Sequence, residues 1–349
     1  MADVNTNKET TEQEKLKQIA AQMRANEYKG LSEEEIQKKE QQKEMRKKRN
    51  REILNDTLNI LENGCYEKAG RAVNLNFSYE QIKSANVFLP DEIDSSRVGF
   101  TKYESEISGS CYENINNSKN CCTFSCKNTD AFSLAWERYQ NCIKNGESDP
   151  GILVLNLASS THPGGRVREG ANAQEEDLCR KSSLLISLES EDAKKYYNYN
   201  NALKTHMGSD AIILSPNVEV VKDSASKPLS SPYKISVISC AAPMIRLGLE
   251  GMTEQKYKMM FYKRIQGILL VASAQKYRHL ILGAFGCGVY GNDAAVVSDL
   301  FFKAITDFES CTLEDIAPFK SIDFAVLCPP DNDYNYKEFY RNFSLRTFK

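Results

Sequence analysis

The chain has 349 residues, 41% of them hydrophobic, so it is long enough to bury a complete core. Its 45 lysines and arginines nearly balance 47 aspartates and glutamates, so no overall basic field points to nucleic-acid binding. Residues 1–23 lack the apolar core of a signal peptide, and no later stretch approaches the roughly 20 apolar residues of a membrane span. We therefore expect an intracellular protein, cytoplasmic and/or nuclear, with no membrane partner.

Residues 1–48 form a charged N-terminal arm, which we expect to be helical or disordered because large apolar residues are few. Its basic run Arg46-Lys47-Lys48-Arg49 is the only place where we consider a nucleic-acid contact or a nuclear address, beside a plainly solvated helix face. From Ile53 onward, apolar residues recur at helical spacing until Gly64 ends the pattern. We place one packed domain over residues 49–349.

The middle of the chain alternates short apolar runs with helical periodicity. We predict strands at 73–77, 152–157, 211–214, 235–240, 279–285 and 324–328, and helices at 130–143, 257–277 and 294–308. The Asn-rich stretches 114–120 and 196–201 are interpreted as surface loops. Several strands are continuously apolar, which is typical of a sheet covered on both faces, so we predict a three-layer α/β/α domain.

The eleven cysteines are scattered and odd in number, so we expect reduced thiols. The densest group has no paired C-x-x-C spacing, and a zinc site there, with one of the three histidines, is the alternative to a loop of free thiols. We expect no metal. That group is Cys111, Cys121, Cys122, Cys126 and Cys142, and the histidines are His162, His206 and His279.

A glycine turn at Gly164-Gly165 follows the apolar run 152–157 and leads to Gln174-Glu175-Glu176. Glycines let backbone N–H groups approach a ligand closely, and two adjacent acids provide one group for a hydroxyl and another to move a proton. This pattern favours an enzyme that acts on a phosphate-bearing sugar. The simpler alternative is a pair of acids that stabilises a helix N-terminus.

A second glycine cluster, residues 286–293, follows the predicted strand 279–285 and has the spacing G-x-G-x-x-G. One interpretation is a nicotinamide dinucleotide site in which Asp307 or Glu309 binds the ribose, but this fingerprint normally opens a domain. Another is simply a tight turn. A glycine loop with a helix behind it favours phosphate in any fold. Because both glycine loops follow predicted strands, we expect them to face one crevice and to hold a diphosphate between them.

Six ordered blocks of this sequence carry a family resemblance. They are residues 51–71 as an entry helix, 153–165, 173–183, 213–216 with Asp223, 232–243, and 283–293. Together they resemble the microbial-type poly(ADP-ribose) glycohydrolase family over roughly residues 45 to 330.

The resemblance implies a macrodomain-like fold with a mixed central sheet and an N-terminal helical extension. It implies an enzyme that hydrolyses the O-glycosidic ribose–ribose bonds of poly(ADP-ribose), releases ADP-ribose and reverses protein ADP-ribosylation. The expected partners are poly(ADP-ribose) or ADP-ribosylated proteins. No cofactor is implied, and we expect a monomer. The alternative function is a macrodomain that binds ADP-ribose without turning it over.

The resemblance also assigns roles to residues. It makes Glu176 the catalytic acid/base, Glu175 a ligand of ribose hydroxyls, and Gln174 a support for this pair. It places Gly164 and Gly165 on the diphosphate. In the same way, Tyr290 packs on the ligand and Asn156 orients the distal ribose. The opposite loop consists of Gly286, Gly288, Val289, Tyr290, Gly291 and Asn292.

Two residues depart from the family pattern. Arg166 occupies the place of a third glycine, and His162 occupies the place of an Asn. If position 166 requires a positive φ, we expect Arg166 to cost about 1 kcal/mol or more and to narrow the pocket. If it does not, the guanidinium is free to pair with phosphate. For His162 we consider a loop-orienting role, a ligand contact or a proton shuttle.

Overall fold

The computed structural model describes residues 28–94, 122–310 and 319–344, together with positions 18, 21 and 25. Its centre is a seven-stranded mixed sheet in the order β3-β6-β7-β5-β8-β9-β4. The strands, in that order, are Asn86–Phe88, Ile212–Lys222, Pro228–Cys240, Ile152–Leu157, His279–Leu282, Ser321–Ala325 and Thr123–Lys127. The five strands from β7 to β4 run parallel, whereas β3, β6 and β7 pair antiparallel.

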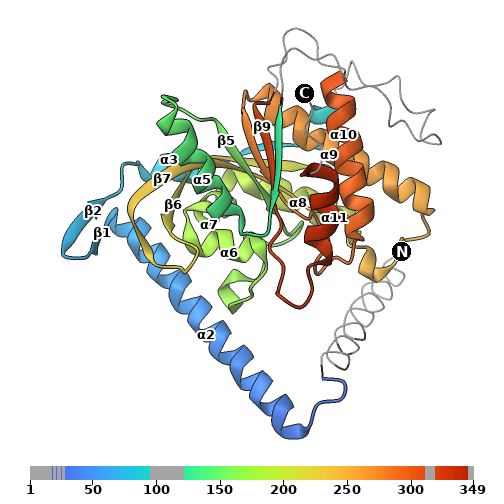
Figure 1. Ribbon diagram of the computed structural model, residues 1–349, viewed down its shortest axis with the longest axis horizontal. Coiled ribbons are helices and arrows are strands. Elements are labelled where there is room, and N and C mark those ends of the chain that lie inside the picture. The colour runs from blue at the N-terminus through green and yellow to red at the C-terminus, as the bar shows by residue number, and fades with distance from the viewer. Residues whose placement is uncertain are drawn as a thin grey trace.

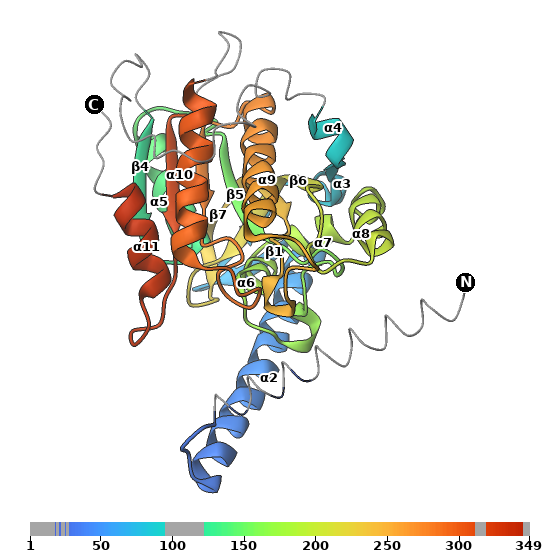
Figure 2. The same ribbon diagram turned by 90° about the vertical axis from the view of Figure 1, so that its right-hand side faces the viewer.

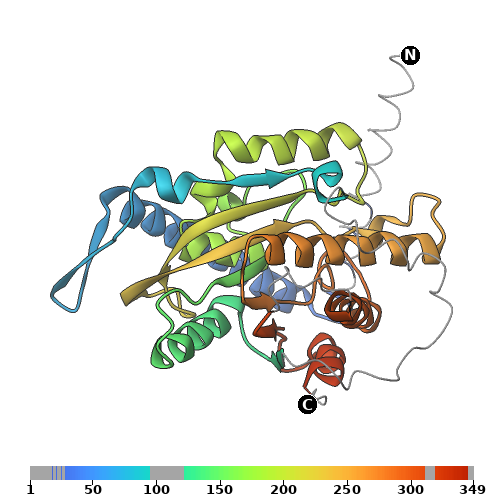
Figure 3. The same ribbon diagram turned by 90° about the horizontal axis from the view of Figure 1, so that it is seen from above.

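Helices cover both faces of this sheet, as Figures 1 and 3 show. One face carries α9 (Glu254–Ala274), α10 (Ala294–Ser310) and α11 (Tyr334–Phe343), which stand in a row in Figure 2. The other face carries α5 (Ala131–Lys144), α6 (Gln174–Lys181), α7 (Leu184–Leu188) and α8 (Glu191–Leu203). Two short helices, α3 (Tyr79–Lys83) and α4 (Pro90–Asp94), flank β3 in the chain.

Strand β5 shows how the sequence produces these layers. Leu153 and Leu155 pack in the core under α9 and α10, while Ile152 and Val154 pack in the core under α5 and α6. Successive side chains of a strand point to opposite faces, so a continuously apolar strand serves two cores at once. The predicted three-layer α/β/α architecture with a mixed sheet is confirmed.

The N-terminal helix α2 spans Glu33–Asn63. It begins at Ser32, whose side chain forms a capping box with Glu35, and it ends at Gly64 with a φ of 65°, as the pattern predicts. Its first half extends away from the sheet (Figure 1), and its second half packs against the domain. The expected boundary between residues 48 and 49 therefore falls inside a continuous helix.

Several predicted elements have other boundaries or another type. The entry-helix block 51–71 is wrong beyond Gly64, because β1 (Cys65–Lys68) and β2 (Arg71–Asn74) form a hairpin there, which also shortens the predicted strand 73–77. The predicted loop 196–201 is wrong as well, since it lies in α8 with Tyr196 and Asn200 buried. The predicted loop 114–120 lies outside the described residues.

Strand β9 starts three residues before its predicted position at 324. Its first half contains Ser321 and Asp323, both fully buried and hydrogen-bonded to each other at 3.0 Å. Polar residues that satisfy one another inside a protein leave no hydrophobic signal. A reading of apolar runs therefore misses them. Strand β8, in contrast, ends at Leu282, earlier than predicted.

Within the described ranges, no helix is both long enough and apolar enough to cross a membrane. The cysteines described there are all free thiols, which agrees with the expectation of reduced cysteines. Cys111 and Cys121, which belonged to the alternative zinc group, lie outside the described residues.

Phe324 offers a test of the core beneath α10 and α11. It is fully buried, and its ring centroid lies 4.0 Å from that of Phe343 and 5.3 Å from that of Phe339. We expect Phe324→Ala to lower the free energy of unfolding by about 3–5 kcal/mol through lost burial and a cavity. Denaturant unfolding measures this. The control Leu203→Ala, at an exposed position, should stay within about 0.5 kcal/mol of wild type, and equal effects would contradict the described packing.

Candidate functional site

A cavity of about 480 Å³ lies at the C-terminal edge of the parallel strands. Leu157 ends β5, Gly283 follows β8 and Ala325 ends β9, and all three line it. Ligands of α/β sheets bind at this edge. The other lining residues come from α6 and the segment before it, from the start of α5, from the second glycine loop, from the segments that follow β5, β7, β8 and β9, from the turn between β6 and β7, and from α11: Thr129, Asp130, Ala131, Ala158, Asn172, Ala173, Gln174, Asp177, Leu178, Lys181, Ser224, Ala242, Ala284, Phe285, Gly286, Gly288, Val289, Tyr290, Val326, Leu327 and Asn335.

Gln174, the first residue of α6, attaches this helix to the end of β5. Its Oε1 accepts a hydrogen bond from Leu157 N at 2.9 Å, and its Nε2 donates to Leu155 O at 2.8 Å. An amide side chain offers an acceptor and a donor, so it can pair with the strand as a neighbouring backbone would. The N-terminus of α6 is thereby fixed at the edge of the sheet.

Glu175 is buried, with 3% of its surface exposed. Its Oε2 accepts from Ser159 N at 2.8 Å and its Oε1 accepts from Asn156 Nδ2 at 3.3 Å. Burial is the main cause that raises the pKa of Glu175 to about 8, and these hydrogen bonds act in the opposite direction. The carboxyl group therefore holds a proton at neutral pH in the ligand-free protein.

Glu176 is held by two backbone donors. Its Oε1 accepts from Arg166 N at 3.0 Å and its Oε2 from Ala173 N at 2.8 Å. Neighbouring helix residues diverge by about 100°, but side chains in the first turn lean back past the N-terminus. For this reason both carboxylates reach the same glycine: a Cβ at Gly165 would lie 2.6 Å from Glu176 Oε1 and 3.0 Å from Glu175 Oε2. Gly165 has a φ of 60°, so two independent constraints require glycine here.

Arg166 fits its position without strain. Its φ is −110°, outside the left-handed region, so the conformational cost considered for a residue in place of the third glycine does not arise. Its guanidinium is exposed and pairs with Glu169, with Nε donating to Oε2 at 2.9 Å. His162 is also exposed, and its Nδ1 lies 2.8 Å from Thr161 Oγ1. Neither side chain lines the cavity.

The second glycine loop lies across the cavity from α6. Asn292 is buried and fastens this loop, since its Nδ2 donates to Pro243 O at 2.8 Å and to Gly286 O at 2.9 Å. Tyr290 reaches the first loop, with its hydroxyl 3.4 Å from Ala158 O. Burial, and then the nearby carboxylates of Glu175 and Glu176, raise the pKa of Tyr290.

The predicted residues divide into two groups. Gln174, Gly286, Gly288, Val289 and Tyr290 line the cavity. The other group surrounds the two carboxylates or supports the loops, and consists of Asn156, Gly164, Gly165, Glu175, Glu176, Gly291 and Asn292. Asn156 is fully buried and also donates to Ser239 Oγ at 3.0 Å, so its contact with the site runs through Glu175.

Asp307, the residue considered for a nicotinamide ribose, does not line the cavity. It lies far along α10, 3.0 Å from Lys303 Nζ and hydrogen-bonded to Tyr262. Glu309 lies in the same part of α10, and its side chain is outside the described residues. The G-x-G-x-x-G spacing therefore builds a loop at the cavity without the acidic ribose ligand of a dinucleotide fold.

Sequence reasoning missed an ion pair at the cavity. Lys181, on α6, is buried and pairs with Asp177 at 2.6 Å, and both line the cavity. Their spacing of four residues, acid before base, is the signal that could have revealed them. Because they line the cavity about one and two turns beyond Gln174, they give this wall a cation held by its own counter-ion.

Sequence reasoning also missed the support that α2 gives to residues 170–172, which precede α6. Asn50 is buried, and its Nδ2 donates to Gly170 O at 3.0 Å. Gly170 has a φ of 82°, and a Cβ there would lie 2.3 Å from Lys47 O, so α2 and this loop touch through their backbones. On the other side, the buried Arg180 donates to Ala171 O at 2.5 Å. Residues 170–172 are therefore held from both sides, directly before the backbone N–H of Ala173 that binds Glu176.

The raised pKa of Glu175 makes a prediction about pH. Between about pH 4.5 and pH 8 the unfolded chain loses this proton while the folded protein keeps it. The contribution of Glu175 to the free energy of unfolding is therefore fully present below pH 4.5. It falls as the pH rises to 8, by up to about 1.4 kcal/mol per pH unit. We expect the thermal stability of Glu175→Gln, relative to wild type, to increase steadily across this range. Parallel pH profiles of the two proteins would show that the carboxyl is not protonated in the folded state.

The contact of α2 with the loop makes another prediction. Asn50→Ala leaves the carbonyl of Gly170 without its donor, so we expect the free energy of unfolding to fall by about 1–3 kcal/mol. The matched control is Asn55→Ala, the same change at an exposed position of the same helix, which should have little effect. Chemical denaturation of both variants measures the difference, and equal stabilities would mean that α2 does not support the loop.

Comparisons with known proteins agree on one family. Residues 54–223 match the model of the microbial-type PARG catalytic domain. A crystal structure of poly(ADP-ribose) glycohydrolase from Thermomonospora curvata is 26% identical, with a TM-score of 0.71, and the match covers 84% of this chain and 99% of that one. The same enzyme bound to the inhibitor ADP-HPD gives a TM-score of 0.68, again at 26% identity and with the same coverage.

The glycohydrolase from Deinococcus radiodurans, in complex with ADP-ribose, is 26% identical with a TM-score of 0.63, and the match covers 77% of this chain and 98% of that one. No curated protein sequence matches the chain. The family model spans the first glycine loop and α6. Residues 54–223 therefore resemble the catalytic domain of microbial-type poly(ADP-ribose) glycohydrolases, and the fold of most of the chain resembles solved structures of these enzymes.

Proposed function

We propose that this protein hydrolyses the O-glycosidic ribose–ribose bonds of poly(ADP-ribose), with Glu176 as the catalytic acid/base. The single observation that carries the assignment of this residue is the convergence of two buried carboxylates on Gly165, beside a cavity between two glycine loops. The substrate is the free polymer or the polymer attached to an ADP-ribosylated protein.

The cavity and its walls support a nucleotide diphosphate sugar as the ligand. The second glycine loop lines the cavity with Gly286, Gly288, Val289 and Tyr290, and the N-terminus of α6 adds the positive end of a helix dipole at the opposite wall. Lys181 contributes a positive charge to the cavity wall. In this arrangement the diphosphate lies between the loops, and Tyr290 packs against the sugar that follows it.

The reaction requires a proton on the departing ribose oxygen and then an activated water molecule. One carboxyl group performs both steps if it gives up its proton during cleavage and takes one from water afterwards. We assign these steps to Glu176, whose two oxygens are oriented by Arg166 N and Ala173 N. The backbone donors fix the direction of the carboxyl group, and this positioning is a large part of catalysis.

Glu175 binds the ribose instead. In the protonated state that its pKa of about 8 implies, it has both a donor and acceptors to offer to neighbouring ribose hydroxyls. Asn156 and Ser159 N hold its two oxygens at the end of β5. Gln174 keeps the start of α6 against that strand, so that Glu175 and Glu176 approach the ligand together.

Isosteric amide variants test the two roles. We expect Glu176→Gln to reduce the release of ADP-ribose from labelled polymer by about 10²–10⁴-fold, while calorimetry shows ADP-ribose affinity within a few-fold of wild type. Glu175→Gln should weaken that affinity. The control Glu191→Gln changes another first-turn glutamate, at the exposed start of α8, and should change neither quantity.

The same measurements include the outcome that would overturn the proposal. A wild-type protein that binds ADP-ribose tightly but releases none from the polymer would be a binding module rather than an enzyme. Normal turnover by Glu176→Gln would show that the protein is an enzyme in which another residue acts as the acid/base.

A further inference from the structure

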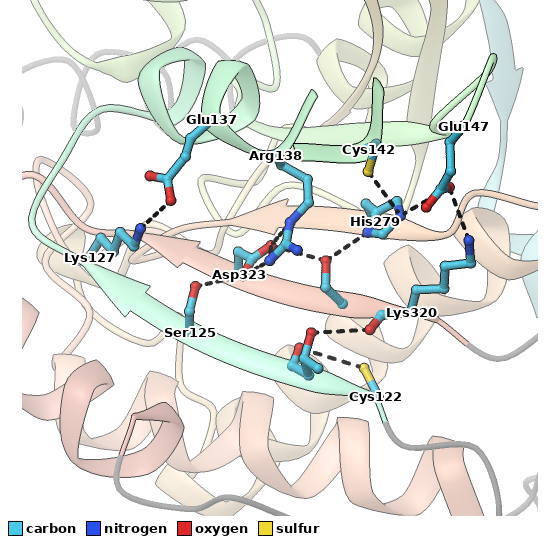
Figure 4. A network of polar contacts seen from close by, with 12 residues as sticks. Cys122, Ser125, Lys127, Glu137, Arg138, Cys142, Glu147, His279, Lys320 and Asp323 are labelled. Carbon is cyan, nitrogen blue, oxygen red and sulfur yellow. Dashed lines mark hydrogen bonds and ion pairs between the residues drawn. The ribbon is translucent and has the colours of Figure 1, made fainter. Parts of the chain in front are cut away.

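A second cluster of reactive side chains lies at the opposite edge of the sheet, as Figure 4 shows. Cys142 is in the last turn of α5, Glu147 follows that helix, and His279 is the first residue of β8. Cys142 and His279 are buried, whereas Glu147 is partly exposed. The catalytic cavity begins beyond the other end of β8, on the order of 10 Å away along the strand, so this cluster is separate from it.

The three side chains point their ligand atoms toward one another. Cys142 Sγ lies 3.5 Å from His279 Nε2, and His279 Nε2 lies 3.8 Å from Glu147 Oε2. All three ligand atoms lie within 4.8 Å of one another. Zinc bonds of about 2.3 Å to sulfur and 2.0–2.1 Å to nitrogen, at a tetrahedral angle, separate these two atoms by about 3.5 Å. The observed spacing between sulfur and nitrogen is therefore that of a tetrahedral metal site.

A chain of hydrogen bonds behind His279 determines which of its nitrogens is free. Asp323 accepts from Arg138 Nη2 at 2.8 Å and from Ser321 Oγ at 3.0 Å. A carboxylate only accepts, so the single proton of Ser321 is used in that bond. The oxygen of Ser321 must then accept from His279 Nδ1, which lies 2.9 Å away. Nδ1 consequently carries the proton of the neutral ring.

The unprotonated Nε2 therefore faces Cys142 and Glu147 with its lone pair. Proteins orient metal-binding histidines in this way, with the distal nitrogen donating to an oxygen that is itself held in place. Here Asp323 and Ser321 provide that support, and Arg138 balances the charge of Asp323. The orientation of the ring is thus set before any ligand arrives.

We propose that Cys142, Glu147 and His279 form a binding site for a divalent metal ion of the zinc type, with a water molecule as the fourth ligand. The thiolate and the carboxylate together neutralise the two charges of the metal, and the thiol proton is released to solvent on binding. Entry is open on the side of Glu147, the least buried of the three. The sequence led us to expect no metal, because the densest group of cysteines has no paired C-x-x-C spacing.

Lys320 is the competitor for this site. Its Nζ lies 3.0 Å from Glu147 Oε2, and 41% of its side chain is exposed. A metal ion must take that carboxylate from the ammonium group, which can move into solvent. Removing the ammonium group should therefore tighten metal binding, a result that a purely structural ion pair would not produce.

Cobalt(II) titration of the full chain, after removal of bound metals, provides the test. We expect one equivalent to bind with a thiolate charge-transfer absorption, and zinc to displace it. Cys142→Ser should abolish this absorption, whereas Cys65→Ser, at an exposed cysteine, should keep it. Lys320→Met should raise the cobalt affinity at least several-fold, and Glu147→Gln should lower it about tenfold.

Absence of the absorption in wild type, or its persistence in Cys142→Ser, would overturn the proposal. If circular dichroism shows that Cys142→Ser is misfolded, the pair Lys320→Met and Glu147→Gln decides, since both change partly exposed side chains. If both variants bind cobalt with the affinity of the wild type, the proposal is also overturned. The readout is metal binding, so the result is independent of whether the protein cleaves poly(ADP-ribose).

Discussion

Three consecutive side chains at the start of α6 bind the backbone of the segments that they face, and the architecture of the site depends on this attachment. Gln174 pairs with β5, Glu175 binds the N–H of Ser159, and Glu176 binds the N–H groups of Arg166 and Ala173. A side chain that bonds to backbone fixes the course of a loop and its own rotamer at once. Removing one of them therefore disturbs both the pocket wall and the reactive group.

This attachment has a cost that the surrounding structure must offset. Two carboxyl groups are almost fully buried side by side, and burial of unpaired charge is strongly unfavourable. The protein reduces this cost by keeping a proton on Glu175 and by giving Glu176 two backbone donors at a helix N-terminus. Buried Arg180 and the helix α2 then hold the loop that supplies those donors.

The sequence predicted well wherever one local signal determines the structure. The strand 152–157 matches β5 at both ends because five of its six residues are apolar, and α10 begins at the predicted Ala294. The sequence was a poor guide where contacts between distant segments determine the structure. The helix α6 has only eight residues, most of them charged or polar, and is anchored by Gln174 to a strand 17 residues earlier. Asn50 acts on Gly170, 120 residues away, and no pattern of either segment indicates this.

The continuity of α2 bears on how this protein can be shortened for study. A fragment that starts at residue 49 would place Asn50 in the fraying first turn of a helix without a cap, and it would lack the Lys47 carbonyl that packs on Gly170. The capping box at Ser32 and Glu35 is the natural beginning of the helix. A truncated form that starts at or before Ser32, well upstream of the point at which the apolar pattern begins, therefore keeps Lys47 and Asn50 inside a capped helix.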